Sequence, residues 1–509
     1  MSFLLVLSYI VFIVFLFCSV FVLSFYNWRW PSHRKLCRKI PRPKFLPFFG
    51  IGLDLVVLEH SELMPYIANL WKKHGPLVYV EYLGVPNVFM GEPQDIEAVL
   101  NNSQHITKGM EYQALLPWLC EGLLTSTGTK WHMRRKMLTP TFHFKILENF
   151  MPIFNRNAKF LTKKLMSTNN TPVDIDAYVS LCTLDIICET AMGTSLDFQM
   201  GEATEYVSAI KKAGEIVLKK SLTFWMNNNF FFNVSSTGRE YRRNVKLLHR
   251  FTEKVIKERK KKYQPYYAYQ EENDIGKQKR RKSFLDCLLE MQRENPNEMT
   301  DEGIREEVDT FMFEGHDTTS MAITWALFMI ASHEDVQERL QEEMQQVFGD
   351  SDRDATLQDL HQLNYLEMVI KESLRLYPSV PYISRMLTTD LKIRNYVIPS
   401  YTNVAIPPYL VHRNPNIYPD PEKFIPERFS PQIAKERHPY AYIPFSAGFR
   451  NCIGQKFAIL EEKVVLSTIL RKLKLNTITK KGELKTLPQM ILRSDPKIEM
   501  SFAPLTAAS

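Results

Sequence analysis

Near its C-terminus the chain reads Phe445-Ser446-Ala447-Gly448-Phe449-Arg450-Asn451-Cys452-Ile453-Gly454. The residues that follow predict an amphipathic helix, with Ile453, Phe457, Leu460 and Val464 on one face. A cysteine at the start of a helix feels the positive end of the helix dipole, and neighbouring glycines let backbone N–H groups approach its sulfur. Both effects favour the thiolate, which is the form that binds metals. The segment therefore predicts a thiolate ligand at Cys452, with a buried structural thiol as the alternative.

The same segment resembles the F-x-x-G-x-R-x-C-x-G haem-binding loop of the cytochrome P-450 family. At residue frequencies of roughly 5% each, five fixed positions coincide by chance on the order of once in a few million starts. The resemblance implies that Cys452 holds the iron of haem b and that Phe445 and Arg450 lie beside the haem. It also implies a mainly α fold with a small β region.

Two further positions resemble haem-binding residues of the family. Trp131-His132-Met133-Arg134-Arg135 is similar to the W-x-x-x-R motif, which implies that Trp131 and Arg135 reach a haem propionate. An ordinary basic helix face is the alternative. Arg385 stands where the family usually places another propionate partner. Together these residues are expected to surround the haem edge.

Two charged segments resemble the family's structural support for the cysteine loop. Glu372-Ser373-Leu374-Arg375 places both charges on one helix face, a pair worth only about 0.2–0.5 kcal/mol when exposed. Pro426-Glu427-Arg428-Phe429 is similar to the family's meander. The resemblance implies a buried triad of Glu372, Arg375 and Arg428, with a structural rather than a catalytic role.

A long helix is predicted from the N-cap Thr300, with Asp301 and Glu302 in its first turn, to about Ser332. Its middle reads Glu314-Gly315-His316-Asp317-Thr318-Thr319-Ser320 and lies between apolar runs. Glycine costs about 1 kcal/mol inside a helix, and Asp and Thr compete there for backbone hydrogen bonds. Residues that disfavour a helix, found in the buried middle of one, are expected to have a functional role.

This helix segment is similar to the family's oxygen-binding segment. The resemblance implies that Gly315 and a threonine bonded to its own backbone open the helix for dioxygen, and that Asp317 and Thr318 relay protons to it. Most members have a small residue where this chain has Glu314; Glu-Gly-His-Asp-Thr-Thr is the form of the family-four branch, the relatives of fatty-acid ω-hydroxylases. In some members of that branch the glutamate is esterified to a haem methyl group. Covalent attachment of haem through Glu314 is therefore a hypothesis for this chain.

The resemblance implies a monooxygenase, because a thiolate ligand favours O–O cleavage. One oxygen atom of O2 would enter an apolar substrate and the other would leave as water.

The chain has no G-x-G-x-x-G opening a βαβ unit, so the electrons are expected from a separate protein. The expected partner is a membrane-bound NADPH-cytochrome P-450 reductase, with cytochrome b5 as a second candidate. Candidates for the docking face are Lys130, Arg134, Lys136 and Lys456, with a solvated surface as the alternative.

Two other functions compete with the monooxygenase. A haem-thiolate isomerase or dehydratase rearranges a peroxide without a reductase, and a non-catalytic haem sensor needs no proton relay; Asp317 and Thr318 argue against both. The pocket is expected to be apolar, which suits fatty acids, terpenoid hormones, cuticular hydrocarbons and xenobiotics about equally. Its candidate walls are Leu115, Leu116, Trp118, Phe311, Val380, Tyr382 and Ile491.

The N-terminal part of the chain predicts a membrane anchor. No residue from Phe3 to Tyr26 is charged, and as a helix this run measures about 36 Å, against about 30 Å for a hydrocarbon core. A cleaved signal peptide would have a shorter apolar run and a positive start. We therefore expect a single transmembrane helix at 3–26, a basic, proline-rich tether at 27–50 and a cytosolic catalytic domain at 51–509, held at the endoplasmic reticulum membrane. The basic residues beside the span are Arg29, Arg34, Lys35, Arg38 and Lys39.

Composition bounds the remaining possibilities. With 509 residues, 45% of them hydrophobic, the chain can bury a large core. Its net charge of +8 is not concentrated as in a nucleic-acid-binding domain, so a membrane surface and an acidic protein partner are favoured and nucleic acid is not expected. Seven cysteines without CxxC pairs indicate a reduced, cytosol-facing body. Short strands are predicted at Leu77–Tyr82 and Asn87–Met90, and a solvated loop at Lys260–Lys282.

Overall fold

The computed structural model describes Ser8 and residues 31–46, 48–142, 144–201, 204–263 and 283–505. The predicted transmembrane helix at 3–26 lies outside these residues, apart from Ser8. Within the described ranges, no helix is long and apolar enough to cross a membrane.

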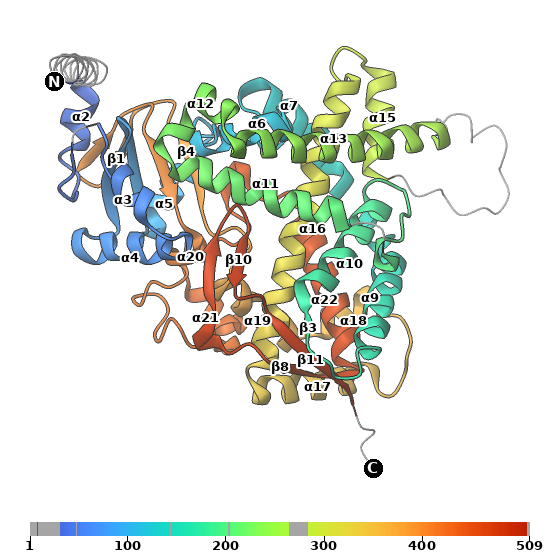
Figure 1. The fold of residues 1–509 in the computed structure, drawn as a ribbon. Helices are drawn as coiled ribbons and strands as arrows, with labels where there is room; N and C mark the ends of the chain where they lie inside the picture. The colour runs from blue at the N-terminus through green and yellow to red at the C-terminus, as the bar shows by residue number, and fades with distance from the viewer. Residues whose placement is uncertain are drawn as a thin grey trace.

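Helices make up most of the described chain, as the sequence predicted (Figure 1). They are α2 (Pro31–Cys37), α3 (Gly52–Val57), α4 (Leu63–His74), α5 (Pro93–Leu100), α6 (Leu116–Leu119), α7 (Gly128–Leu138), α8 (Phe144–Glu148), α9 (Met151–Met166), α10 (Ile175–Thr190), α11 (Thr204–Leu222), α12 (Asn229–Val234), α13 (Ser236–Lys262), α15 (Phe284–Glu294), α16 (Asp301–Ala331), α17 (Glu334–Phe348), α18 (Leu357–Gln362), α19 (Asn364–Leu376), α20 (Pro408–Val411), α21 (Pro431–Glu436) and α22 (Gln455–Leu470).

The strands are short and form small separate sheets, one beside the N-terminal helices and another near the C-terminal end of the chain (Figure 1). They are β1 (Leu77–Tyr82), β2 (Val85–Met90), β3 (Val173–Asp174), β4 (Ile383–Met386), β5 (Leu391–Ile393), β6 (Tyr396–Ile398), β7 (Asn403–Ile406), β8 (Leu473–Thr477), β9 (Lys485–Pro488), β10 (Leu492–Asp495) and β11 (Glu499–Pro504). The largest sheet has the order β1-β2-β7-β4, with β2 and β7 parallel and the other pairs antiparallel. Arg385 of β4 pairs with Val404 of β7 in this sheet. The sheet therefore fixes the backbone position of Arg385, which is one of the residues predicted to bind haem.

Helix α16 runs through the middle of the helical region (Figure 1). The predicted start is confirmed, because the side chain of Thr300 accepts a hydrogen bond from the Gly303 backbone N–H. Most of its residues are buried, since α10, α13, α15, α19 and α22 all pack against it. A helix enclosed on every side needs no polar face. The buried polar residues in the middle of α16 are therefore candidates for a functional role.

Two details of the helices differ from the sequence expectations. Helix α22 is not amphipathic: every residue from Glu461 to Leu470 is buried, because the helix lies between α9 and α16. The predicted loop at Lys260–Lys282 begins too early, since α13 continues to Lys262 and Lys260 forms an ion pair with Asp301 at the start of α16. Residues 264–282 lie outside the described part of the chain.

The described part of the tether packs on the body. Cys37 and Ile40 are buried with the residues of β1, β2 and β7, and the Tyr79 backbone N–H donates to the Pro41 carbonyl at 2.9 Å. Arg34, which the sequence assigned to the basic membrane flank, is buried and lies 3.5 Å from Glu81. Its charge is therefore used inside the fold, because Glu81 is fully buried and requires a cation.

Candidate active site

The cysteine loop is held in one conformation by its backbone. The Cys452 N–H donates to the Phe445 carbonyl at 2.9 Å, and Arg135 donates to the carbonyl and side-chain oxygens of Asn451 at 2.8 and 2.7 Å. Gly448 has a φ of +66°, and a Cβ there would lie 1.9 Å from the Leu100 carbonyl oxygen. No residue with a side chain fits at this position. The motif requires glycine here because the end of α5 lies against the backbone of the loop.

The thiol of Cys452 lies deep in the fold and yet is accessible. Its pKa is raised to about 11, because burial and Glu314 raise it by more than a Gly454 backbone N–H, Arg135 and Lys108 lower it. Its residue is nevertheless exposed, so protein atoms do not fill the space beside it. The helix that follows begins only at Gln455, and the protein's own donors do not offset burial. A bound metal cation deprotonates a coordinating thiol, so a metal at Cys452 would favour the predicted thiolate.

Four cations surround the same space. The guanidinium of Arg450 donates to the carbonyls of Ser126 and Leu124 and lies 4.7 Å from the Trp131 ring centroid. Burial, followed by the neighbouring Arg385, lowers the pKa of Arg450 to about 9. Burial, Arg385 and Arg450 likewise lower the pKa of Lys108. In the part of the chain that the structure describes, no carboxylate lies within ion-pairing distance of Arg135, Arg385, Arg450 or Lys108.

This residue set fits a haem. Arg385 and Arg450 are buried, and buried cations without carboxylate partners are costly unless an anion neutralises them. The two propionates of a haem would do so. Cys452 offers a soft ligand to iron on the same space. The fold brings together residues from three distant stretches of sequence: Trp131 with Arg135, Arg385, and Arg450 with Cys452. Lys108 was not predicted, because an isolated lysine in a loop matches no motif.

The middle of α16 faces this space with Glu314 and Thr318. The Thr318 hydroxyl donates to the Glu314 carbonyl at 2.6 Å, as the resemblance implied, and Thr319 donates to the Gly315 carbonyl at 3.2 Å. Burial raises the pKa of Glu314, while Lys108, Arg450 and Arg135 lower it. Gly315 has a different role from the one expected: α16 is not interrupted there, and a Cβ on Gly315 would lie 2.5 Å from the Ile187 side chain of α10. This glycine lets two helices approach closely.

Asp317 is buried and bound to an arginine that the sequence reasoning missed. One guanidinium nitrogen of Arg493, in β10, lies 2.5 and 2.6 Å from the two carboxylate oxygens of Asp317. Arg493 belongs to no motif, and its partner is far away in sequence, so no local signal could have found it. The carboxylate proposed as a proton relay is therefore held by a cation.

The predicted charge triad is confirmed. Glu372 and Arg375 are fully buried and joined at 2.7 and 2.8 Å, and the Arg428 side chain lies 3.5 Å from Glu372. Arg375 also donates to the carbonyls of His412 and Pro421, and the His412 ring accepts from the Ile443 backbone N–H. These contacts connect the triad to the segment that enters the cysteine loop.

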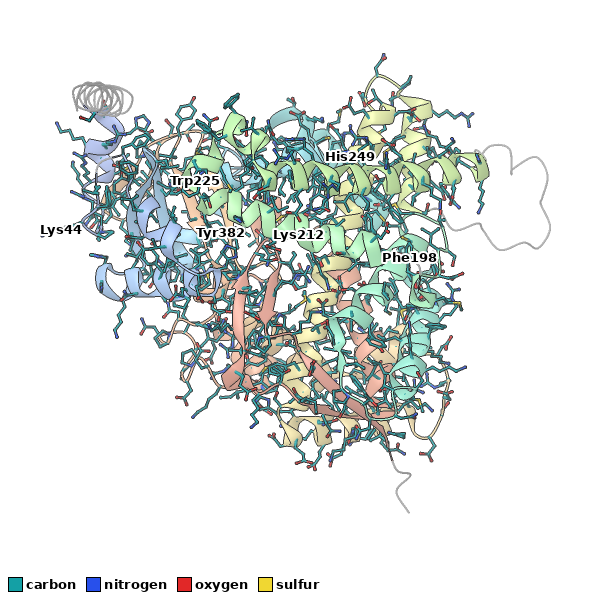
Figure 2. All side chains as sticks on the ribbon, in the orientation of Figure 1. Lys44, Phe198, Lys212, Trp225, His249 and Tyr382 are labelled. Carbon is teal, nitrogen blue, oxygen red and sulfur yellow. The ribbon has the colours of Figure 1, made fainter. Side chains whose placement is uncertain are left out.

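The predicted pocket walls are partly apolar and partly polar. Leu115, Trp118, Phe311 and Ile491 are buried, whereas Leu116 is 40% exposed. Phe311 packs against the rings of Phe142 and Phe284. Tyr382, immediately before β4 (Figure 2), is half-buried, and burial, followed by Glu111 and Tyr112, raises its pKa. The space therefore also has polar groups near Tyr382 that the sequence did not predict.

Arg134, which was predicted to belong to the docking face, is buried instead. Its guanidinium lies 3.8 Å from Glu306 and from Glu307 of α16, so it cannot contact a partner protein. Lys130 forms ion pairs with Glu121 and Glu306, while Lys136 and Lys456 are exposed.

Comparison with known proteins agrees with this geometry. The family model described as Cytochrome P450 matches residues 40–502. Cytochrome P450 4c3 of Drosophila melanogaster is 42% identical over 96% of this chain and 94% of its own length. Cytochrome P450 4c21 of Blattella germanica is 44% identical over 92% and 94%, and cytochrome P450 4V2 of Mus musculus is 45% identical over 83% and 81%. The family implies a haem-iron cofactor, which the cysteine and cations of the site fit. The chain belongs to the cytochrome P450 family and is an oxidoreductase of the monooxygenase class.

Proposed function

We propose that this protein inserts one oxygen atom of O2 into an apolar substrate, using electrons from NADPH delivered by a cytochrome P450 reductase. The observation that carries the proposal is the accessible Cys452 thiol beside four cations without carboxylate partners, of which Arg385 and Arg450 are buried and Arg135 and Lys108 are partly buried. Bound haem supplies the thiolate-assisted cleavage of dioxygen. We infer that Cys452 ligates its iron and that Trp131, Arg135, Arg385, Arg450 and Lys108 hold its propionate edge.

The chain's own residues would prepare the site for this chemistry. Phe445 and the glycines of the loop fix the thiol, and the Glu372 triad fixes the loop. Thr318 presents its hydroxyl beside Glu314, and Asp317 supplies the acidic group behind it. Buried apolar walls such as Leu115, Trp118 and Ile491 exclude water and favour an apolar substrate.

The setting of the enzyme follows from the same proposal. The uncharged run at 3–26 would anchor the chain in the endoplasmic reticulum membrane, where a membrane-bound reductase and cytochrome b5 can reach it. Lys136 and Lys456 remain the candidates for the docking face, since both are exposed. Fatty acids are the first substrate class to screen, followed by terpenoids and xenobiotics.

The test is a reconstitution of the full chain in membranes with NADPH-cytochrome P450 reductase and a fatty-acid panel. The proposal expects hydroxylated product that depends on both NADPH and the reductase. Conversion of a peroxide without reductase would instead identify an isomerase or dehydratase. Haem-loaded protein that consumes neither NADPH nor oxygen with any substrate would indicate a sensor.

We also propose that Glu314 forms an ester with a haem methyl group. A methyl C–H bond would break as the carboxylate C–O bond forms, and O2 with two electrons from the reductase would take up the two electrons released, giving water. Its carboxyl lies beside the cations of the haem edge, which lower its pKa against the effect of burial. Mass spectrometry of acid-denatured enzyme should find haem attached to the peptide that contains Glu314, and none attached in Glu314→Ala. Complete extraction of haem from the wild-type protein after turnover would contradict the ester.

A further inference from the structure

Helix α13 carries a row of cations along its solvent-exposed face. At about 100° per residue, all of them lie within about 80° of one another around the helix axis, and the row is about 27 Å long. The three glutamates of the helix, Glu240, Glu253 and Glu258, fall outside this sector. We call the row the basic stripe. Its members are the exposed side chains of Arg243, Lys246, Arg250, Lys254, Lys257 and Lys261.

No side chain of the basic stripe forms an ion pair with a carboxylate of the described residues. Cations beside it do: Lys212 of α11 pairs with Glu215, and Lys260, on another side of α13, pairs with Asp301. Like charges three or four residues apart repel each other and destabilise a helix. The helix dipole favours cations only in the last turn, which accounts for Lys261 but not for the other members. The stripe therefore destabilises α13 unless anions lie against it.

The basic stripe starts beside an exposed apolar helix. Helix α12 ends two residues before α13 begins and packs against it. Phe230 and Phe231 of α12 are 70% and 55% exposed, whereas Phe232 is buried. Exposed aromatic side chains next to a line of cations are typical of a surface that lies on a membrane, where the cations meet anionic headgroups. This neighbour favours a lipid surface over an acidic protein as the partner.

The charge at the other end of the molecule favours the same orientation. Figure 1 shows α2, α12 and α13 along one edge and α17 at the opposite end. Helix α17 exposes Asp335, Glu338 and Glu342, and none of the three has an ion pair within the described ranges. An anionic plane attracts the edge with α13 and repels the end with α17, so the field of the protein turns the stripe towards it.

We propose that the basic stripe of α13 binds the headgroups of anionic phospholipids. The phosphate and carboxylate groups of these lipids supply the anions that the stripe lacks within the fold. The uncharged run at 3–26 has no means of distinguishing anionic from neutral lipids, so the stripe gives the protein a lipid preference that an anchor alone does not. This interaction is separate from the proposed reaction, and its test needs no turnover.

Lysine labelling of the haem-loaded full chain in lipid nanodiscs tests the contact. One set of discs contains phosphatidylcholine alone, and the other contains equal parts of phosphatidylcholine and phosphatidylserine. Mass spectrometry follows the reaction of each lysine with an acetylating reagent. We expect the four stripe lysines to react about fivefold more slowly in the discs with phosphatidylserine, because an anionic surface holds nearby ammonium groups in their unreactive protonated form. The difference should vanish at about 1 M salt, where the Debye length is about 3 Å.

Two exposed lysines at the opposite end of the molecule are internal controls. They are Lys435 of α21 and Lys480, which follows β8, and both should react equally in the two kinds of disc. Lys254→Glu combined with Lys257→Glu should remove the protection of Lys246. The matched variant, Lys435→Glu combined with Lys480→Glu, changes the net charge equally and should leave that protection unchanged. All four substituted side chains are exposed, so both variants should fold, which circular dichroism checks.

Equal labelling of the stripe lysines in both kinds of disc would overturn the proposal. Protection that appears in neutral discs on addition of the reductase, and not with phosphatidylserine, would identify a protein partner and would overturn it as well. Insertion into neutral discs tests the expected anchor at 3–26 separately. If the chain does not insert, that anchor is refuted, and sedimentation with phosphatidylserine vesicles, compared with phosphatidylcholine vesicles, then decides whether the stripe binds lipid.

Discussion

Glu372 and Glu427 are two glutamates with arginine partners in opposite surroundings. Glu372 is fully buried between Arg375 and Arg428, whereas Glu427 pairs with Arg339 where both side chains are about half exposed. Removing one partner of a buried ion pair leaves an uncompensated charge and costs about 3–5 kcal/mol. An exposed pair is worth about 0–1 kcal/mol.

We therefore predict that Glu372→Gln lowers the free energy of unfolding by about 3–5 kcal/mol and that the control Glu427→Gln changes it by less than about 1 kcal/mol. Denaturant unfolding of the two variants, followed by circular dichroism, measures the difference. Equal losses in both variants would show that burial of the triad does not stabilise the cysteine loop.

The buried carboxyl of Glu462 in α22 predicts a pH dependence. Burial raises its pKa from 4.5 to about 8 in the folded protein. Between these values the unfolded chain loses the proton and the folded chain keeps it, so stability falls as pH rises, by about 1.4 kcal/mol per pH unit for one group. Glu462→Gln should flatten the fall in unfolding free energy between pH 5 and 8. The exposed Glu436→Gln should leave the slope as it is; an unchanged slope in Glu462→Gln would contradict the assignment.

At the scale of elements, the contact between α10 and α16 depends on Gly315. A Cβ there would lie 2.5 Å from the Ile187 Cδ1 atom, closer than side chains approach. We predict that Gly315→Ala destabilises the protein by about 1–3 kcal/mol through overpacking, despite the better helix propensity of alanine. In the background Ile187→Ala the same change should be stabilising. The control is Gly482→Ala, where a Cβ meets nothing within 4 Å; a double-mutant cycle with no coupling would refute the steric explanation.

The sequence predicted those elements whose signals are local. The cap at Thr300, the strands at Leu77–Tyr82 and Asn87–Met90 and the spacing of Glu372 and Arg375 all agree with the structure. It failed for Arg134, because Arg134 and Arg135 look alike in sequence although a helix separates consecutive side chains by about 100°. One guanidinium therefore lies buried against α16 and the other reaches Asn451 beside Cys452.

The contacts that could not be predicted join residues far apart in the chain. Arg493 binds Asp317 across 176 positions, from a short strand with no motif of its own. Lys108 reaches the cluster of cations from a loop, and Glu462 is buried only because α22 is covered by neighbouring helices. In each case the chemistry of the residue is set by the assembled fold rather than by its neighbours in sequence.

At the scale of the whole molecule, the central claim is that the fold brings Cys452 together with a haem held by Trp131, Arg135, Arg385 and Arg450. The most direct test is the reduced, carbon-monoxide difference spectrum of the membrane-expressed protein, compared with Cys452→Ala and with the control Cys287→Ala in α15. We predict a strongly red-shifted Soret band in the wild type and in Cys287→Ala, and its loss in Cys452→Ala. A folded, haem-loaded wild-type protein without that band, or a Cys452→Ala variant that retains it, would contradict the account.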